Sequence, residues 1–447
     1  MASAKKSASR PSEITTRVRA AVGGGPVRPL PLDRKGSELA TALNECQTSY
    51  PGTVRRSSLI QRFNTIPTGA FSLDYALFGG LPEGLATLFY GWEGSGKTTV
   101  AIGAVREAQR KYPGKMVLWV DAERTFDKDW AELHGVDLDR LYVVEPDHGQ
   151  MAVDIVARFH EVEECCMIVV DSIPALVPQN ILKKSASDQT MTELARLVGI
   201  MCSKSTAAWA TQRKRRHYVT MILINQLRDK IGTLHGGDMQ PGGHQLQFFI
   251  TTRVRLTGRE VLANELKKAD QDKLGLAIAE DAKKDKSLST PEFVEHTFKI
   301  TKAKIGASMR QGEFRMNVNP QNALLRIGQY DDAKIAMLFA KRIGLLQGAA
   351  GAYFLLNISG DEVFRTYADM ERWLCRNPDR LLLLRQVLIA SLRISKQYQP
   401  IPDDGFLLAP INDRAFVQTA QQYVATAVTE NPLEPETETE AGPPAAL

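Results

Sequence analysis

The stretch that most constrains the fold is Gly91–Thr98, which reads Gly-Trp-Glu-Gly-Ser-Gly-Lys-Thr. It fits the pattern G-x-x-x-x-G-K-[ST] and stands between an apolar, strand-like run, Ala86–Tyr90, and a helix-forming segment, Thr99–Tyr112. Glycines let the backbone adopt positive φ and approach a phosphate closely, and the N–H groups of such a loop point inward at the positive end of the next helix. The sequence therefore predicts a phosphate-binding loop; the alternative is an ordinary glycine turn before a helix.

The side chains of this loop indicate which ligand it would hold. Lys97 would reach the β- and γ-phosphates of a nucleoside triphosphate, and the Thr98 hydroxyl would hold Mg²⁺. We therefore expect ATP and Mg²⁺ as cofactors. The residues expected to contact the nucleotide are Gly91, Glu93, Gly94, Ser95, Gly96, Lys97, Thr98 and Thr99.

Apolar runs alternate with helical patterns after the loop, which is typical of a doubly wound, mostly parallel α/β sheet. The runs are Met116–Glu123, Leu141–Val144, Met167–Ser172 and Tyr218–Gln226, followed by Phe248–Leu256 and Phe298–Ile305 towards the edge of the sheet. Ligands of such sheets bind beyond the carboxyl ends of the strands, where Glu123, Asp171 and Gln226 fall. Asp171 closes an apolar strand and is expected to hold Mg²⁺; the alternative is a strand that merely ends in an acid.

Composition divides the chain into five parts. A basic, flexible arm is expected at 1–34, an N-terminal helical segment with a helix over Ser37–Glu45 at 35–66, the nucleotide-binding core at 67–330, a small, mainly helical domain at 331–400, and an extension with an acidic, disordered tail at 401–447. Within the core, 259–290 is a charged insertion, either a solvated surface or a partner site. The arm is either a solubilising tail or a contact to a phosphate backbone.

The overall composition fits a soluble globular protein. Hydrophobic residues make up 43% and charged residues 24% of the 447 residues, and the net charge is +5. We find no apolar run long enough to cross a membrane and no secretory signal. The five cysteines show neither metal-ligand nor disulfide spacing. Cys165 and Cys166 lead into an apolar strand and are expected to be small buried thiols of a reducing compartment.

Several short blocks resemble bacterial RecA recombinases in order and spacing, from about Ser37 to Leu392. They are Thr68-Gly69 with Ser72-Leu73-Asp74, Gly80-Leu81-Pro82, Val120–Glu123, Ile168–Ser172, Ile224–Arg228, Lys299–Ile305 and Ala350–Tyr353. Because these blocks are independent and in register, the resemblance is more specific than the phosphate loop alone.

The resemblance implies roles for single residues. Glu123 would activate the attacking water, Gln226 would sense the γ-phosphate, and Trp130 would stack on adenine, unless it is a core tryptophan. Lys302 and Lys304 would reach the ATP of a neighbouring subunit, as an arginine finger does. Without the resemblance, they are alternating lysines on a strand.

Two segments resemble the family's DNA-binding loops, at about Pro178–Arg196 and Leu227–His244. The residues expected to bind DNA are Met191, Arg196, Arg228, Lys230, Gly242 and Gly243. Ordinary surface flexibility is the alternative for such glycine-rich loops. Phe248 would relay the nucleotide state between subunits, or be a buried strand residue.

Some positions depart from the family's pattern. Trp92 and Gly94 replace Pro and Ser in the loop, which leaves its defining residues intact. His244 and Gln247 replace Asn and Lys near Phe248, which weakens one expected DNA contact and one contact between subunits.

The resemblance implies an ATPase that forms helical filaments on single-stranded DNA, pairs it with duplex DNA and exchanges strands, with loading or mediator proteins as further candidate partners. It also implies that the protein acts in the cytoplasm of a bacterium or of a phage-infected host. Two rivals stay open. One is a closed-ring helicase or translocase with the same ATPase core. The other is a DNA-binding mediator that does not hydrolyse ATP, against which Glu123 and Gln226 argue.

Overall fold

The computed structural model describes residues 38–49, 64–182, 191–215, 217–229, 238–262, 265–266, 291–305, 309–349 and 351–398. The basic arm, most of the insertion and the acidic tail therefore lie outside the described residues. The chain divides into two compact units, 1–62 and 63–447. In the first unit, helix α2 (Glu38–Ser49) confirms the helix expected over Ser37–Glu45 and extends four residues further. The second unit contains the predicted nucleotide-binding core and C-terminal domain, and the domain boundaries at 66, 330 and 400 stay a prediction.

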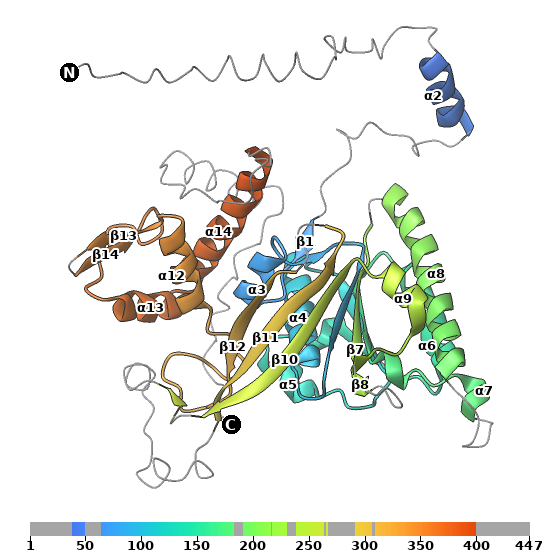
Figure 1. The fold of residues 1–447 in the computed structure, drawn as a ribbon, viewed down its shortest axis with the longest axis horizontal. Coiled ribbons are helices and arrows are strands. Elements are labelled where there is room, and N and C mark those ends of the chain that lie inside the picture. Colours follow the sequence, from blue (N-terminus) through green and yellow to red (C-terminus); the bar gives the residue numbers. More distant parts are fainter. Residues whose placement is uncertain are drawn as a thin grey trace, which may run out of the picture. The chain divides into compact units, whose positions relative to one another are not determined.

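The second unit is built on an eight-stranded sheet in the order β12-β11-β10-β3-β7-β6-β4-β5 (Figure 1). The six strands from β10 to β5 run parallel, whereas β11 and β12 are antiparallel additions. The predicted α/β fold with a mostly parallel sheet is thereby confirmed. The strands are β3 (Ala86–Gly91), β4 (Met116–Asp121), β5 (Leu141–Val144), β6 (Cys165–Asp171), β7 (Thr220–Gln226), β10 (Thr252–Leu262), β11 (Pro291–Ala303) and β12 (Gln311–Asn317).

Helices cover both faces of this sheet, which explains why its central strands are apolar on both sides. Along β4, Val117 and Trp119 face a core shared with α4 (Lys97–Lys111) and α5 (Lys128–Leu133). Leu118 and Val120 face a second core, shared with α6 (Gly149–Phe159), α8 (Met191–Arg215) and α9 (Gly243–Phe249). Among the helices in the described ranges, none is both long and apolar enough to cross a bilayer.

Two expectations at the β10–β11 hairpin were wrong. Residues Phe248 and Phe249 end helix α9, and the strand begins only at Thr252. The insertion also does not begin at Arg259, because β10 continues to Leu262 and pairs with β11 as far as Pro291. Apolar burial explains the longer strand, since Val261 is 5% exposed and packs with Phe293 inside an otherwise charged stretch.

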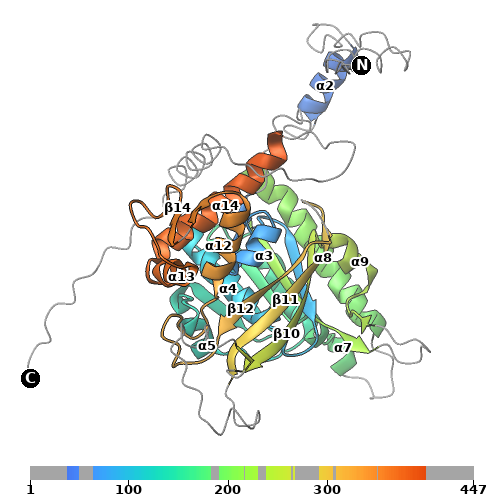
Figure 2. The ribbon, with the colours of Figure 1, turned by 60° about the vertical axis from the view of Figure 1, so that its left-hand side comes forward.

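The C-terminal part of this unit is largely helical, as expected. It has its own apolar core and consists of α12 (Asp332–Arg342), the hairpin β13 (Leu346–Ala349) and β14 (Ala352–Leu355), α13 (Tyr367–Arg376) and α14 (Pro378–Tyr398). It packs on the short helix α3 (Phe71–Ala76), which lies beside α12 in Figure 2. The rings of Phe71 and Phe339 meet edge to face there, at 5.9 Å between centroids. Arg385 of α14 pairs with buried Asp74 of α3 and with buried Asp332 of α12. Asp332 also accepts a hydrogen bond from the Phe71 N–H at 3.1 Å, so both carboxylates join the two parts.

The cysteines form no disulfide in this structure. Cys165, Cys166 and Cys202 are buried, and burial raises the pKa of each thiol to about 12. The expectation of small buried thiols is therefore confirmed for Cys165 and Cys166, and Cys202 is a third buried thiol, whereas Cys46 and Cys375 are half-buried.

Candidate nucleotide site

The phosphate loop joins the end of β3 to the start of α4, as the motif requires. Gly94 and Gly96 have φ of 70° and 81°, a left-handed backbone that favours glycine, and Gly96 is the N-cap of α4. The next residue, Lys97, is 6% exposed, and its Nζ donates to the Trp92 carbonyl at 2.7 Å and to Ser95 Oγ at 3.2 Å. Burial lowers the pKa of Lys97, and nearby Asp171 opposes the shift. The loop thus holds one cation at the positive end of a 15-residue helix.

A hydroxyl and a carboxylate meet beside the loop. Thr98 Oγ1 donates to Asp171 Oδ2 at 2.9 Å. Asp171 is 7% exposed at the end of β6, and burial raises its pKa to about 7, against the opposing effect of the Thr98 hydrogen bond. In the described part of the chain, no group of three or more His, Cys, Asp or Glu could hold a metal. The pair nevertheless fits Mg²⁺, which takes oxygen ligands, one or two from protein and others from phosphates and water.

Three strand ends meet around Glu123. Gln226 ends β7 level with Gly91, and its Nε2 donates to Glu123 Oε1 at 2.8 Å. The Ser172 hydroxyl, directly after β6, donates to the same carboxylate oxygen. The structure therefore brings the predicted Glu123, Asp171 and Gln226 together at the carboxyl ends of the central strands. Ser172 was missed by sequence reasoning, and its position next to Asp171 was the only signal that could have found it.

Trp130 lies on α5, half-buried at the margin of the core around α4. Its ring meets His134 at 4.4 Å between centroids. It therefore packs partly as a core residue, and its stacking on adenine stays a prediction.

Lys302 and Lys304 lie on β11 towards the amino-terminal ends of the parallel strands, away from the phosphate loop. Lys302 pairs with Arg253 on β10, which in turn is level with Leu88 on β3. Gly91 is three residues further, so Lys302 is about 10 Å along the sheet and two strands, also about 10 Å, across it from the phosphate loop. Their ammonium groups instead donate to the carbonyls of Gln247 and Phe248, at the negative end of α9.

Phe248 itself lies exposed on α9. Its exposed fraction of 75% excludes the buried strand phenylalanine that was the simple alternative. Its relay role stays a prediction.

The first predicted DNA-binding loop is largely helical where the structure describes it. Helix α7 (Gln179–Leu182) precedes the undescribed residues 183–190, and α8 begins at Met191. Pro178–Arg196 is therefore not a continuous loop: the segment from Met191 onwards is helix, with Arg196 exposed on it.

The second predicted loop is flanked by a short hairpin. Arg228, which is exposed, pairs with Met239 across strands β8 (Arg228–Asp229) and β9 (Asp238–Met239), while Lys230 lies outside the described residues. Gly242 and Gly243 have φ of 103° and 75° where α9 begins. A Cβ on Gly243 would lie 2.8 Å from the Ala195 side chain of α8, so close packing of the two helices accounts for this glycine.

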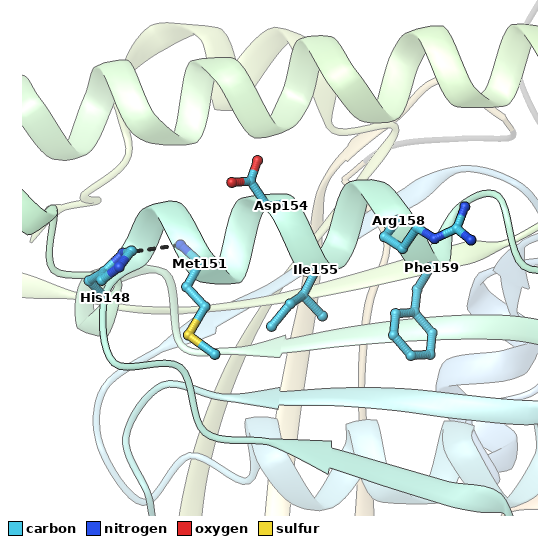
Figure 3. Close-up of a pocket in the computed structure, with 6 residues that line it drawn as sticks. All are labelled: His148, Met151, Asp154, Ile155, Arg158 and Phe159. Atoms are coloured by element: carbon cyan, nitrogen blue, oxygen red, sulfur yellow. Dashed lines mark hydrogen bonds between the residues drawn. The ribbon is translucent and has the colours of Figure 1, made fainter.

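A hollow of about 510 Å³ runs along helix α6. Figure 3 shows its lining on α6 and its N-cap, namely His148, Met151, Asp154, Ile155, Arg158 and Phe159. It contains none of the residues predicted to bind nucleotide or DNA.

Comparison with known sequences decides the family. The profile of the RecA N-terminal domain matches residues 38–308, more than half of the chain. The chain belongs to the RecA family. It is 35% identical over 306 residues to Protein RecA of Symbiobacterium thermophilum, covering 67% of this chain and 79% of that one. It is 30% identical over 327 residues to Protein RecA of Mesoplasma florum, covering 71% and 84%, and 35% identical over 230 residues to Protein RecA of Aquifex pyrophilus, covering 50% and 64%.

The RecA profile ends at residue 308, within the segment that joins β11 and β12. It therefore spans the phosphate loop, the Glu123 cluster and the two lysines of β11. The long, charged β10–β11 connection lies inside the matched region.

Proposed function

We propose that this chain is a DNA-dependent ATPase of homologous recombination and repair that acts in the cytoplasm. It binds ATP and Mg²⁺, assembles into a filament on single-stranded DNA, pairs this strand with homologous duplex DNA and exchanges strands. Membership of the RecA family supports the class of activity. The observation that carries the proposal is the hydrogen bond between Gln226 and Glu123, because it joins the candidate catalytic carboxylate to the strand that continues into the second DNA-binding loop.

The residues of the site divide the work of hydrolysis. The N–H groups of the phosphate loop and Lys97 bind the phosphates, and Thr98 and Asp171 hold Mg²⁺, which neutralises charge on the phosphate oxygens. Glu123 orients the attacking water and accepts its proton. Ser172 and Gln226 hold one oxygen of Glu123, so the carboxylate has a defined direction before it reacts.

Gln226 couples nucleotide state to DNA binding. It ends β7 beside Gly91, where the phosphate loop begins, and residues 228–239 follow it directly. A γ-phosphate that draws its amide away from Glu123 would shift the loop towards the DNA-binding arrangement, and hydrolysis would reverse this population shift.

The second contribution to the site comes from a neighbouring copy. Lys302 and Lys304 are too far from the phosphate loop of their own subunit, so their proposed contact with ATP requires an adjacent subunit. Two cations placed in trans would neutralise charge that develops in the transition state. Hydrolysis would then depend on filament assembly.

ATP hydrolysis by the full chain, with and without single-stranded DNA, tests the proposal. We expect DNA to stimulate turnover, and Glu123→Gln to keep ATP binding while stimulated turnover falls by about 10²–10⁴-fold, the usual contribution of a general base. Arg158→Gln, on the outer side of α6, is the matched surface control and should behave as wild type. Absence of stimulated turnover in the wild type would favour the non-hydrolysing mediator, and equal turnover without DNA would contradict coupling.

A further inference from the structure

A buried histidine lies directly under the phosphate loop. His296 is on β11 and is 2% exposed. Neither ring nitrogen has a hydrogen-bond partner of good geometry among the described residues, although the backbone of Ser95 in the loop lies close enough to interact weakly with the ring. Burial lowers the pKa of His296 to about 4, against the weaker opposing effect of Ser95, so the ring is neutral at physiological pH. Polar atoms that are buried with such poor partners are costly for the fold to keep.

The space that the ring occupies is created by two glycines. A Cβ on Gly96 would lie 2.3 Å from Cε1 of His296, and a Cβ on Gly258 would lie 3.2 Å from Nδ1 and 2.9 Å from the Gly94 carbonyl oxygen. Gly258 is the cross-strand partner of His296 on β10. Phe314 of β12 closes the next side, at 5.1 Å between ring centroids. The imidazole thus fills the gap between the sheet and the phosphate loop.

This contact falls at the point that decides the geometry of the loop. Gly96 is the left-handed N-cap of α4 and precedes Lys97, the residue expected to bind the phosphates. The height of Gly96 above the sheet sets where its N–H group and the Lys97 side chain point. A rigid ring beneath Gly96 fixes this height, whereas a smaller side chain would leave room for the loop to sink.

We propose that His296 is a positioning residue of the nucleotide site, whose neutral ring forms the floor on which the phosphate loop rests. The proposal rests on the proposed function, because it assumes that the loop binds ATP. It predicts a specific effect on ATP affinity. A merely structural role for His296 would predict lower stability with unchanged affinity once the protein is folded.

His160 provides the matched control. It is likewise buried, at 1% exposure, with a pKa lowered to about 4, but it lies just after α6 and contacts Ser205 of α8 on the other face of the sheet. His160→Ala should therefore lower thermal stability without changing the binding of ATP. His296→Ala removes the ring beneath Gly96, whereas His296→Gln keeps a neutral planar group of similar length.

Titration calorimetry of the full chain with ATP and Mg²⁺ measures the effect. We expect His296→Ala to weaken ATP binding about tenfold or more, because the loss of even one hydrogen bond to a charged phosphate costs about that much in affinity. We expect the KM for ATP to rise while kcat changes less than about threefold, because the contacts that are lost bind the ground state and the transition state equally. His296→Gln should recover most of the affinity, and free imidazole should recover part of it in His296→Ala.

Each result separates the alternatives. Wild-type affinity in His296→Ala, or equal losses in His296→Ala and His160→Ala, would overturn the proposal while leaving the proposed function intact. If His296→Ala does not fold, the comparison of His296→Val with His160→Val decides, because valine leaves part of the space under the loop empty and is well tolerated in a strand. A raised KM for ATP confined to His296→Val supports the proposal, and an unchanged KM contradicts it. Failure of the wild type to bind ATP would instead refute the proposed function.

Discussion

Replacing Arg385 by methionine should lower the free energy of unfolding, and the loss should grow with pH. Arg385 of α14 places Nη1 3.3 Å from Asp332 Oδ2 and Nη2 3.6 Å from Asp74 Oδ2, and it donates to the Gly69 carbonyl at 3.1 Å. Both carboxylates are almost completely buried. Burial raises the pKa of Asp74 to about 7 and that of Asp332 to about 6, and Arg385 is the largest opposing effect on each.

The sign of the effect follows from proton linkage. A carboxyl whose folded pKa lies above its unfolded value of about 3.9 binds its proton more tightly in the folded state, so its contribution to stability is lost as pH rises towards the folded pKa. Arg385→Met raises that pKa further, so the loss continues to higher pH. If the pKa of Asp74 rises by ~2 units, the free energy of unfolding falls by about 2 kcal/mol more than in the wild type at pH 9. Near pH 6 or below, the substitution removes only packing and the hydrogen bond to Gly69, so the free energy of unfolding should fall by about 1 kcal/mol.

Urea unfolding at pH 6 and pH 9, followed by circular dichroism, measures this difference. Arg372→Met is the control, because Arg372 forms an exposed ion pair with Asp369 on α13, and its effect should be small and equal at both pH values. A loss for Arg385→Met that is the same at pH 6 and pH 9 would show that the guanidinium does not hold these carboxylates ionised.

Two further predictions concern the trans lysines and a buried histidine. Lys302→Ala with Lys304→Ala should leave ATP binding by the unassembled protein unchanged and lower DNA-stimulated turnover by about 10³-fold, the lower range for cations supplied in trans; unchanged stimulated turnover would remove them from the site. The pKa of His160 in the folded state, about 4, lies below its unfolded value of about 6.5, so stability is lost as pH falls from 6.5 towards 4. Between pH 7.5 and pH 5, the free energy of unfolding measured with urea should therefore fall by about 2 kcal/mol less in His160→Gln than in the wild type. An equal fall in both proteins would contradict a neutral, buried ring.

The central strands were predictable because their signal is local. Met116–Val120 is apolar at successive positions, as a strand buried on both faces must be, and it forms most of β4 with alternate residues in the two cores. The phosphate loop was equally local, since its glycines, lysine and threonine are consecutive. Neither depends on residues distant in the sequence.

Other features depend on contacts that a sequence does not display. Phe248 and Phe249 have high β-propensity, yet they belong to α9, which packs on α8 where Gly243 allows close approach. Strand β12 was missed because Gln311–Asn317 is short and half polar, and its pairing with β11 stabilises it. Arg385 and Asp74 are paired by the topology of the whole unit, and nothing local to either residue indicates the other.

The contact beneath the phosphate loop shows the same limit at the site. Gly96 is explained by the motif alone, whereas His296 is a single histidine in a charged strand, 200 residues later. Only the folding of β10 and β11 against β3 brings the ring to the loop.

Electron microscopy of the full chain with single-stranded DNA and a slowly hydrolysed ATP analogue tests directly whether this protein forms a nucleotide-dependent filament. We expect open helical filaments that follow the DNA and require the nucleotide. Closed rings, or dispersed single subunits under the same conditions, would contradict it.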